Sequence, residues 1–154
     1  MRAFFDSNVL VYALATDDDQ RRQVALSLVQ AHSAAGSMVL STQVLMETYN
    51  VLTRKKRAVG ADARASLRLL ARHEVVALGA SAALNAMALA EQHKLSPWDA
   101  LIVQAAIESG CDTLFTEDLQ AGRRFGDVEV VNPFELKAHE PAPKFVARPR
   151  VRRR

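Results

Sequence analysis

Four acidic residues, spread over most of the chain, stand where an apolar segment ends or where a helix is expected to begin: Asp6, Glu47, Asp99 and Asp118. Carboxylates gathered at low dielectric repel one another unless cations or protons neutralise them. Oxygen ligands without cysteine or histidine favour Mg²⁺ or Mn²⁺, and the four histidines show no metal-ligand spacing. Two such ions, about 3.5–4 Å apart, can activate water and stabilise the leaving oxygen in phosphodiester cleavage. The acids therefore predict metal-dependent phosphodiester chemistry if the fold gathers them.

Short strands alternate with helices along the chain. Apolar residues at helical spacing, such as Val24, Leu28 and Ala31, indicate helices, and short apolar runs indicate strands. The expected strands are about residues 3–5, 38–41, 74–78, 113–116 and 128–131, and the expected helices are about residues 19–34, 42–57, 61–73, 81–93 and 96–109. This alternation predicts an α/β fold, with a mostly parallel sheet of about five strands that helices cover on both faces.

Local signals set the expected helix boundaries. Thr42 and Ser96 are expected N-caps, and Gly60 is expected to separate two helices. Pro97 fits the first helical position, where a missing N–H costs nothing.

In such a sheet, the topology sends all four acids to one edge. Asp6 and Asp118 follow strands, whereas Glu47 and Asp99 lie in the first turns of helices that start at the same edge. Ligands bind these folds outside the carboxyl ends of the strands, at the point where the strand order reverses. Whether the four acids meet depends on the strand order, which the sequence leaves open.

Each acid also has an ordinary structural explanation. Asp6 could cap the segment that follows it, and Glu47 could be a solvated helix residue, although its apolar neighbours favour a cleft. Asp99 stands in the first turn of a helix, where acids are favoured by capping and by the helix dipole. Asp118 competes with its neighbour Glu117 for a place in any acidic site. The joint pattern is therefore more specific than any single member.

The composition indicates one folded domain in a reducing compartment. At 154 residues and 49% hydrophobic content, the chain can bury a core. Cys111 is the one cysteine, so no intrachain disulfide can form. No apolar run approaches the roughly 20 residues of a membrane span, and Asp6 interrupts any secretory leader at the start. We therefore expect a cytoplasmic protein without a membrane partner.

The charge is distributed unevenly between the body and the C-terminal tail. Residues 1–136 carry 13 basic and 16 acidic residues, and residues 137–154 carry 7 basic and 1 acidic residue. The proline- and arginine-rich tail has too few large apolar groups to offset its ordering entropy, so we expect it to be disordered. It either binds RNA phosphates or is a solvated extension.

Four acidic motifs follow one another along the chain: "FFDSNVLVYAL", "STQVLMETYNVLTRK", "LSPWDALIVQAA" and "LFTEDLQAGRRFGDVEVVNPF". In this order they resemble the motifs of PIN domains, and specifically of VapC-type toxin ribonucleases from toxin–antitoxin systems. The resemblance covers about residues 2–136. It implies a three-layer α/β/α nuclease domain over residues 1–136 with Mg²⁺- or Mn²⁺-dependent endoribonuclease activity on RNA. It also implies a homodimer that a cognate antitoxin inhibits.

The resemblance also assigns roles within the acidic site. It implies that Asp6 and Asp99 are metal ligands and that Glu47 and Asp118 complete the site, directly or through water. The residues that would orient ligands or water are Asn8 and Thr116, with Glu117 as a possible further acid.

Three other interpretations fit part of this pattern. A haloacid-dehalogenase-type phosphatase also has an aspartate after its first strand, but it needs a second one two residues later, where this chain has Asn8. A receiver domain needs a phosphoacceptor aspartate after the third strand, and "EVVALGAS" has none. A catalytically weak module that binds RNA or an antitoxin would keep the same acids. Metal-dependent RNA cleavage that is lost in Asp6→Asn separates the enzyme from the binding module.

Removal of the tail tests its expected disorder. Truncation after Lys137 should leave the melting temperature nearly unchanged, because a disordered segment contributes no packing. If the arginines contact phosphates, RNA affinity should fall and its salt dependence should become shallower. A large loss of stability would show that the tail packs on the body or on a second copy.

Overall fold

A six-stranded sheet forms the centre of the molecule. The computed structural model describes residues 1–54 and 58–135. The strands are β1 (Ala3–Phe5), β2 (Met38–Ser41), β3 (Glu74–Val76), β4 (Thr113–Phe115), β5 (Arg124–Phe125) and β6 (Val128–Val131). Their order across the sheet is β3-β2-β1-β4-β6-β5. All neighbours pair in parallel except β5 and β6, which pair antiparallel.

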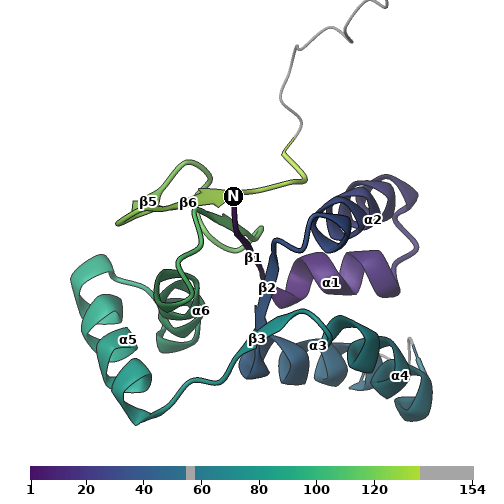
Figure 1. Cartoon of the computed structure of the whole chain (residues 1–154), viewed down its shortest axis with the longest axis horizontal. Helices are drawn as coiled ribbons and strands as arrows, with labels where there is room; N and C mark the ends of the chain where they lie inside the picture. Colours follow the sequence, from purple (N-terminus) through teal and green to yellow (C-terminus); the bar gives the residue numbers. More distant parts are fainter. Residues whose placement is uncertain (55–57, 136–154) are drawn as a thin grey trace, which may run out of the picture.

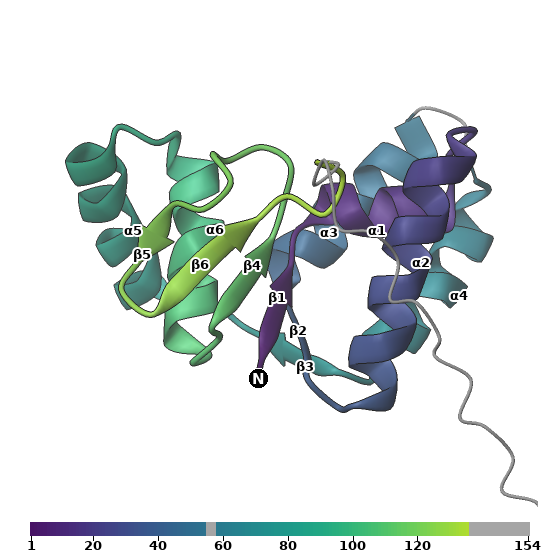
Figure 2. The ribbon, with the colours of Figure 1, turned by 90° about the horizontal axis from the view of Figure 1, so that it is seen from above.

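Helices cover both faces of the sheet. They are α1 (Ser7–Leu14), α2 (Asp19–Ala34), α3 (Thr42–Arg54), α4 (Gly60–Leu70), α5 (Ala80–His93) and α6 (Pro97–Glu108). Helices α1 to α4 lie on one side of the sheet and α5 and α6 on the other (Figures 1 and 2). Right-handed crossovers explain this division, because β1, β2 and β3 step in one direction and the connection from β3 to β4 steps back. The predicted three-layer fold with a mostly parallel sheet is confirmed.

Two elements were not expected from the sequence. Helix α1 follows Asp6 directly, although its apolar and β-branched residues also suit a strand. Burial decides in favour of the helix, because Val9 and Leu10 are fully buried and α1 packs on α2 and α3. Strand β5 is a two-residue edge strand, joined to β6 by a tight turn in which Gly126 has a φ of 59°. An element this short leaves no periodic signal.

Helix boundaries differ slightly from the sequence-based expectation. Ser41, the last residue of β2, accepts a hydrogen bond from the amide of Val44 at 3.3 Å and so caps α3 in place of Thr42. Gly60 begins α4 rather than only separating two helices. The expected continuation of α3 through residues 55–57 and the basic tail after residue 136 lie outside the described residues, and the domain boundary there stays a prediction.

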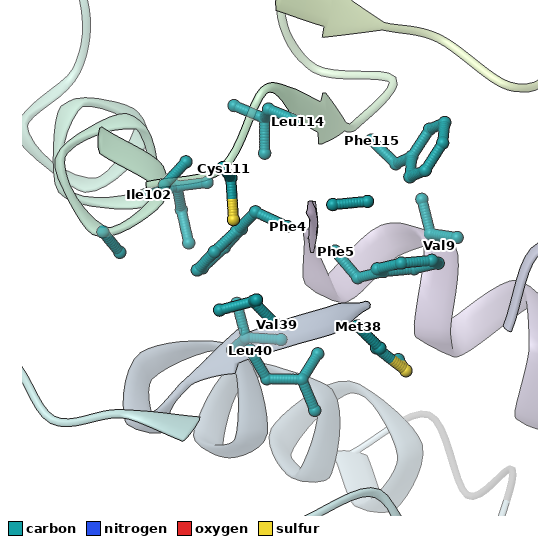
Figure 3. Packing of buried hydrophobic residues seen from close by; sticks show 14 of the residues in the cluster. Phe4, Phe5, Val9, Met38, Val39, Leu40, Ile102, Cys111, Leu114 and Phe115 are labelled. Atoms are coloured by element: carbon teal, nitrogen blue, oxygen red, sulfur yellow. The ribbon is translucent and has the colours of Figure 1, made fainter. Parts of the chain in front are cut away.

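The core lies around β1, the third strand in the sheet order. Phe4 and Phe5 point to opposite faces of the sheet, as successive strand residues must (Figure 3). Phe4 points toward Ile102 and Cys111, and Phe5 toward Val9 (Figure 3). Because both faces are buried, β1 can be wholly apolar until the chain reaches the sheet edge. Within the described residues, no helix is long and apolar enough to cross a membrane.

Replacing Phe4 by alanine should lower the free energy of unfolding by about 3–5 kcal/mol, because it leaves a cavity in the centre of the sheet. Leu69→Ala is the control, since this α4 side chain is 58% exposed and should cost less than about 0.5 kcal/mol. Urea denaturation of both variants measures the difference. Equal losses would contradict the position of the core.

Candidate active site

The candidate site lies where β1 and β4 end side by side. Strand order reverses between these strands, because the chain leaves β1 toward β2 and leaves β4 toward β6. Phe5 pairs with Phe115, and the amide of Asp6 donates to the carbonyl of Phe115 at 3.0 Å. The next residues, Asp6 and Thr116, therefore meet at the edge where such folds bind ligands.

Asp6 is a buried carboxylate at the bottom of this site. It is only 5% exposed. Its Oδ1 accepts from the amide of Ser7 at 2.7 Å, so that it is also the N-cap of α1, and its Oδ2 accepts from Thr116 Oγ1 at 2.8 Å. Burial raises the pKa of Asp6 to about 6; both hydrogen bonds oppose the shift, while the charges of Asp118 and Glu47 add to it. Asp6 thus caps α1, as the ordinary structural explanation expects, and is also a buried acid at the predicted edge of the sheet.

Glu47 reaches the site from α3 and is held by two polar side chains. Ser7 Oγ donates to Glu47 Oε2 at 3.2 Å and lies 3.5 Å from Asp6 Oδ1, so that it stands between the two acids. Gln43, one turn before Glu47, donates from Nε2 to Glu47 Oε1 at 2.7 Å. Neither Ser7 nor Gln43 was predicted as a site residue. The helical spacing of Gln43 and Glu47 was the available signal.

Asp118 enters the site from the segment after β4. Asn8 donates from Nδ2 to Asp118 Oδ2 at 3.1 Å and to Thr116 Oγ1 at 3.2 Å. The amide of Asp118 donates to the same threonine hydroxyl at 3.1 Å. Thr116 is therefore the junction between Asp6 and Asp118, which is the position expected of a residue that orients ligands.

Asp99 lies in the first turn of α6. Its amide donates to Ser96 Oγ at 3.1 Å, which bears out the predicted serine cap. Its carboxylate has no hydrogen bond or ion pair with any described residue. The neighbouring Trp98 carbonyl accepts from Gln43 Nε2 at 3.3 Å, and the same nitrogen bonds Glu47. Gln43 thus links Glu47 to the backbone beside Asp99, whereas the described residues show no contact between the Asp99 carboxylate and the other acids.

The Glu117 carboxylate is bound by side chains of α1 and α2 and not by the residues around Asp6. Its Oε1 accepts from the Tyr12 hydroxyl at 2.9 Å and its Oε2 from Arg21 Nη1 at 2.8 Å. The structure thus places the suggested further acid in an ion pair between α1 and α2. Sequence reasoning missed Tyr12 and Arg21 because nothing in their spacing relates them to the segment after β4.

The donor chemistry of the site fits a hard cation, although the ligand set is not preformed. Within the described residues, no three His, Cys, Asp or Glu side chains form a ready metal site. The site offers only oxygen ligands around a buried acid, which suits Mg²⁺ or Mn²⁺. Asn8 Oδ1 and Gln43 Oε1 are buried without a hydrogen-bond partner in the described part of the chain. Both amides turn their nitrogens to carboxylates, which leaves acceptor oxygens for a cation or its water.

Metal-free protein should lose stability as the pH rises through about 6, because the buried Asp6 must then ionise. Its folded-state pKa lies above the ordinary value of 3.8, so the stabilisation is fully present below that value and is lost on passing the higher one. Asp6→Asn should remove this dependence and raise the unfolding free energy of neutral, metal-free protein by up to about 3 kcal/mol, at 1.36 kcal/mol per pKa unit. Urea denaturation of both proteins in EDTA across this pH range measures the difference. A constant difference between them would contradict the burial argument.

Three solved structures have similar folds. VapC20 of Mycobacterium tuberculosis, described as a sarcin–ricin loop cleaving toxin, is 26% identical with a TM-score of 0.61, and the match covers 75% of this chain and 91% of that one. A toxin–antitoxin complex from Klebsiella pneumoniae is 21% identical with a TM-score of 0.63, covering 87% and 99%. VapBC2 of Rickettsia felis, bound to a DNA fragment from its promoter, is 20% identical with a TM-score of 0.61, covering 84% and 97%.

The chain matches a known protein family over most of its length. No curated protein sequence matches the chain. The PIN domain family profile matches residues 3–125. This stretch includes β1, the helices α1 to α6 and the segments that carry the four acids. Because the match spans most of the chain, the protein belongs to the PIN domain family.

Proposed function

We propose that the protein is a metal-dependent endoribonuclease and the toxin of a toxin–antitoxin pair. The observation that carries the proposal is the buried Asp6 carboxylate between β1 and β4, with Glu47 and Asp118 close enough to raise its pKa. A fold keeps such an unfavourable group where a ligand offsets the cost, and a divalent cation does so for three neighbouring acids. Membership of the PIN domain family and the similarity to VapC toxins support the same function.

Each residue has a role in this proposal. Asp6 and Asp99 would hold the cation, and Glu47 and Asp118 would complete its surroundings directly or through water. When bound, Mg²⁺ or Mn²⁺ supplies Lewis-acid activation of water and neutralises charge on the leaving oxygen of the phosphodiester. The residues that orient the acids are Ser7, Asn8, Gln43 and Thr116.

The side chains around the acids act before any substrate arrives. Thr116 fixes the Asp6 carboxylate through the 2.8 Å hydrogen bond and accepts from the Asp118 amide. Ser7 and Gln43 each donate to one oxygen of Glu47. These contacts limit the orientations of the Asp6, Glu47 and Asp118 side chains before a cation binds.

The partners follow from the similar structures and from the resemblance. RNA is the proposed substrate, since VapC20 is described as cleaving the sarcin–ricin loop. A cognate antitoxin is the proposed inhibitor, because the Klebsiella and Rickettsia structures are toxin–antitoxin assemblies. Homodimerisation and a cytoplasmic location complete the proposal.

Purified protein should cleave single-stranded RNA with Mg²⁺ or Mn²⁺ and not with EDTA, and Asp99→Asn should abolish this cleavage. The variant should also reduce the stabilisation by Mn²⁺ while the metal-free protein stays equally stable or becomes more stable, because one repelling charge is gone. If Asp99 were only a dipole partner of α6, its loss would destabilise the metal-free protein by about 0.3–1 kcal/mol and leave cleavage intact.

Asp62→Asn is the matched control, since Asp62 is an exposed acid in the first turn of α4. It should lose only the dipole contribution and keep full cleavage. Thermal denaturation with and without Mn²⁺, beside an RNA cleavage assay, compares the two variants. An active Asp99→Asn protein with normal Mn²⁺ stabilisation would overturn the shared site. Metal-dependent RNA binding without cleavage in the wild type would instead favour the weak binding module.

A further inference from the structure

Glu117 is an acid beside the candidate site whose charge is already paired. It lies between Thr116 and Asp118, which both belong to the acidic network. Its two carboxylate oxygens are both used, one by the Tyr12 hydroxyl at 2.9 Å and the other by Arg21 Nη1 at 2.8 Å. The carboxylate is thus turned from the acids toward α1 and α2, which lie side by side (Figures 1 and 2).

Arg21 is itself fixed from several directions. Its Nη1 donates to the Tyr12 hydroxyl as well as to Glu117. The guanidinium carbon lies 5.1 Å from the ring centroid of Tyr12 and 5.5 Å from that of Phe134, and Nε lies 3.4 Å from Asp18. Arg21 and Glu117 side chains are 41% and 25% exposed. Because Arg21 packs against two aromatic rings and the pair is partly buried, its geometry is better fixed than that of an exposed surface ion pair.

A cavity connects Glu117 to the acidic site. It has a volume of about 300 Å³, and its lining includes Ser7, Asn8, Tyr12, Glu117 and Asp118. Ser7 donates to Glu47 and lies beside Asp6, so the cavity reaches the network around the buried acid. Glu117 and Asp118 both line this cavity, so a Glu117 carboxylate released from Arg21 could turn within it toward Asp118.

We propose that Arg21 and Tyr12 are positioning residues that hold the Glu117 carboxylate out of the acidic site. The inference rests on the proposed metal-dependent function. The number of charged ligands sets the affinity of a site for a divalent cation. By withholding one acid, the two residues keep the cation weakly held, with positions left for water and phosphate. A released Glu117 would tighten metal binding and occupy a position that the substrate needs.

The test is Arg21→Gln, which removes the cation but keeps a polar side chain. The Mn²⁺ concentration that gives half of the maximal thermal stabilisation should fall roughly tenfold, because a further carboxylate joins the site. RNA cleavage at saturating Mn²⁺ should fall as well. Adding Glu117→Gln to this variant should restore the wild-type Mn²⁺ midpoint, because the released side chain is then neutral. Arg21→Lys keeps the positive charge and should also keep the wild-type midpoint.

Arg22→Gln is the matched control, since it makes the same charge change one residue along α2 at an exposed position. It should leave the Mn²⁺ midpoint and cleavage unchanged. A wild-type midpoint in Arg21→Gln, or a changed midpoint that Glu117→Gln does not restore, would overturn the inference while the proposed function stands. Wild-type protein that neither binds Mn²⁺ nor cleaves RNA would overturn both.

Discussion

The hydrogen bond from Thr116 to Asp6 is the contact on which the rest of the site depends. It joins the ends of β1 and β4 at 2.8 Å. A buried carboxylate is costly unless donors compensate it, and the closest donors to Asp6 among the described residues are this hydroxyl and the Ser7 amide. The same hydroxyl accepts from Asn8 and from the Asp118 amide. One side chain therefore couples the acid after β1 to the acid after β4.

The strand order explains why this contact can form. The crossovers from β1 to β2 and from β2 to β3 step in one direction across the sheet. The connection from β3 to β4 then steps back past β2 and β1, which places β4 beside β1. The sequence predicts the alternation of strands and helices, and so the common edge for the four acids. It does not predict which strands are neighbours, because the central strands are short and mostly apolar, so that their sequences do not specify a partner strand. It missed α1 for a related reason, since tertiary packing overrides the local preference of its residues.

The roles of the individual acids were harder to predict than their position at one edge of the sheet. Glu117 and Asp118 are adjacent in sequence and chemically alike, yet one pairs with Arg21 and the other with Asn8. The positions of Tyr12 on α1 and Arg21 on α2 distinguish them. For Asp99, the sequence predicts the local contact but not the long-range one. The serine cap was readable from "SPWD", whereas the link through Gln43 to Glu47 joins residues far apart in the chain.

The separation of the two central partners also has a consequence for synthesis of the chain. Asp6 and Thr116 are 110 residues apart. During synthesis of the chain, Asp6 is made long before Thr116. A fragment that ends before β4 therefore cannot form their hydrogen bond. Contacts of such long range form late and slowly in folding. A chain interrupted before residue 116 therefore lacks the contact between Asp6 and Thr116 on which the candidate site depends.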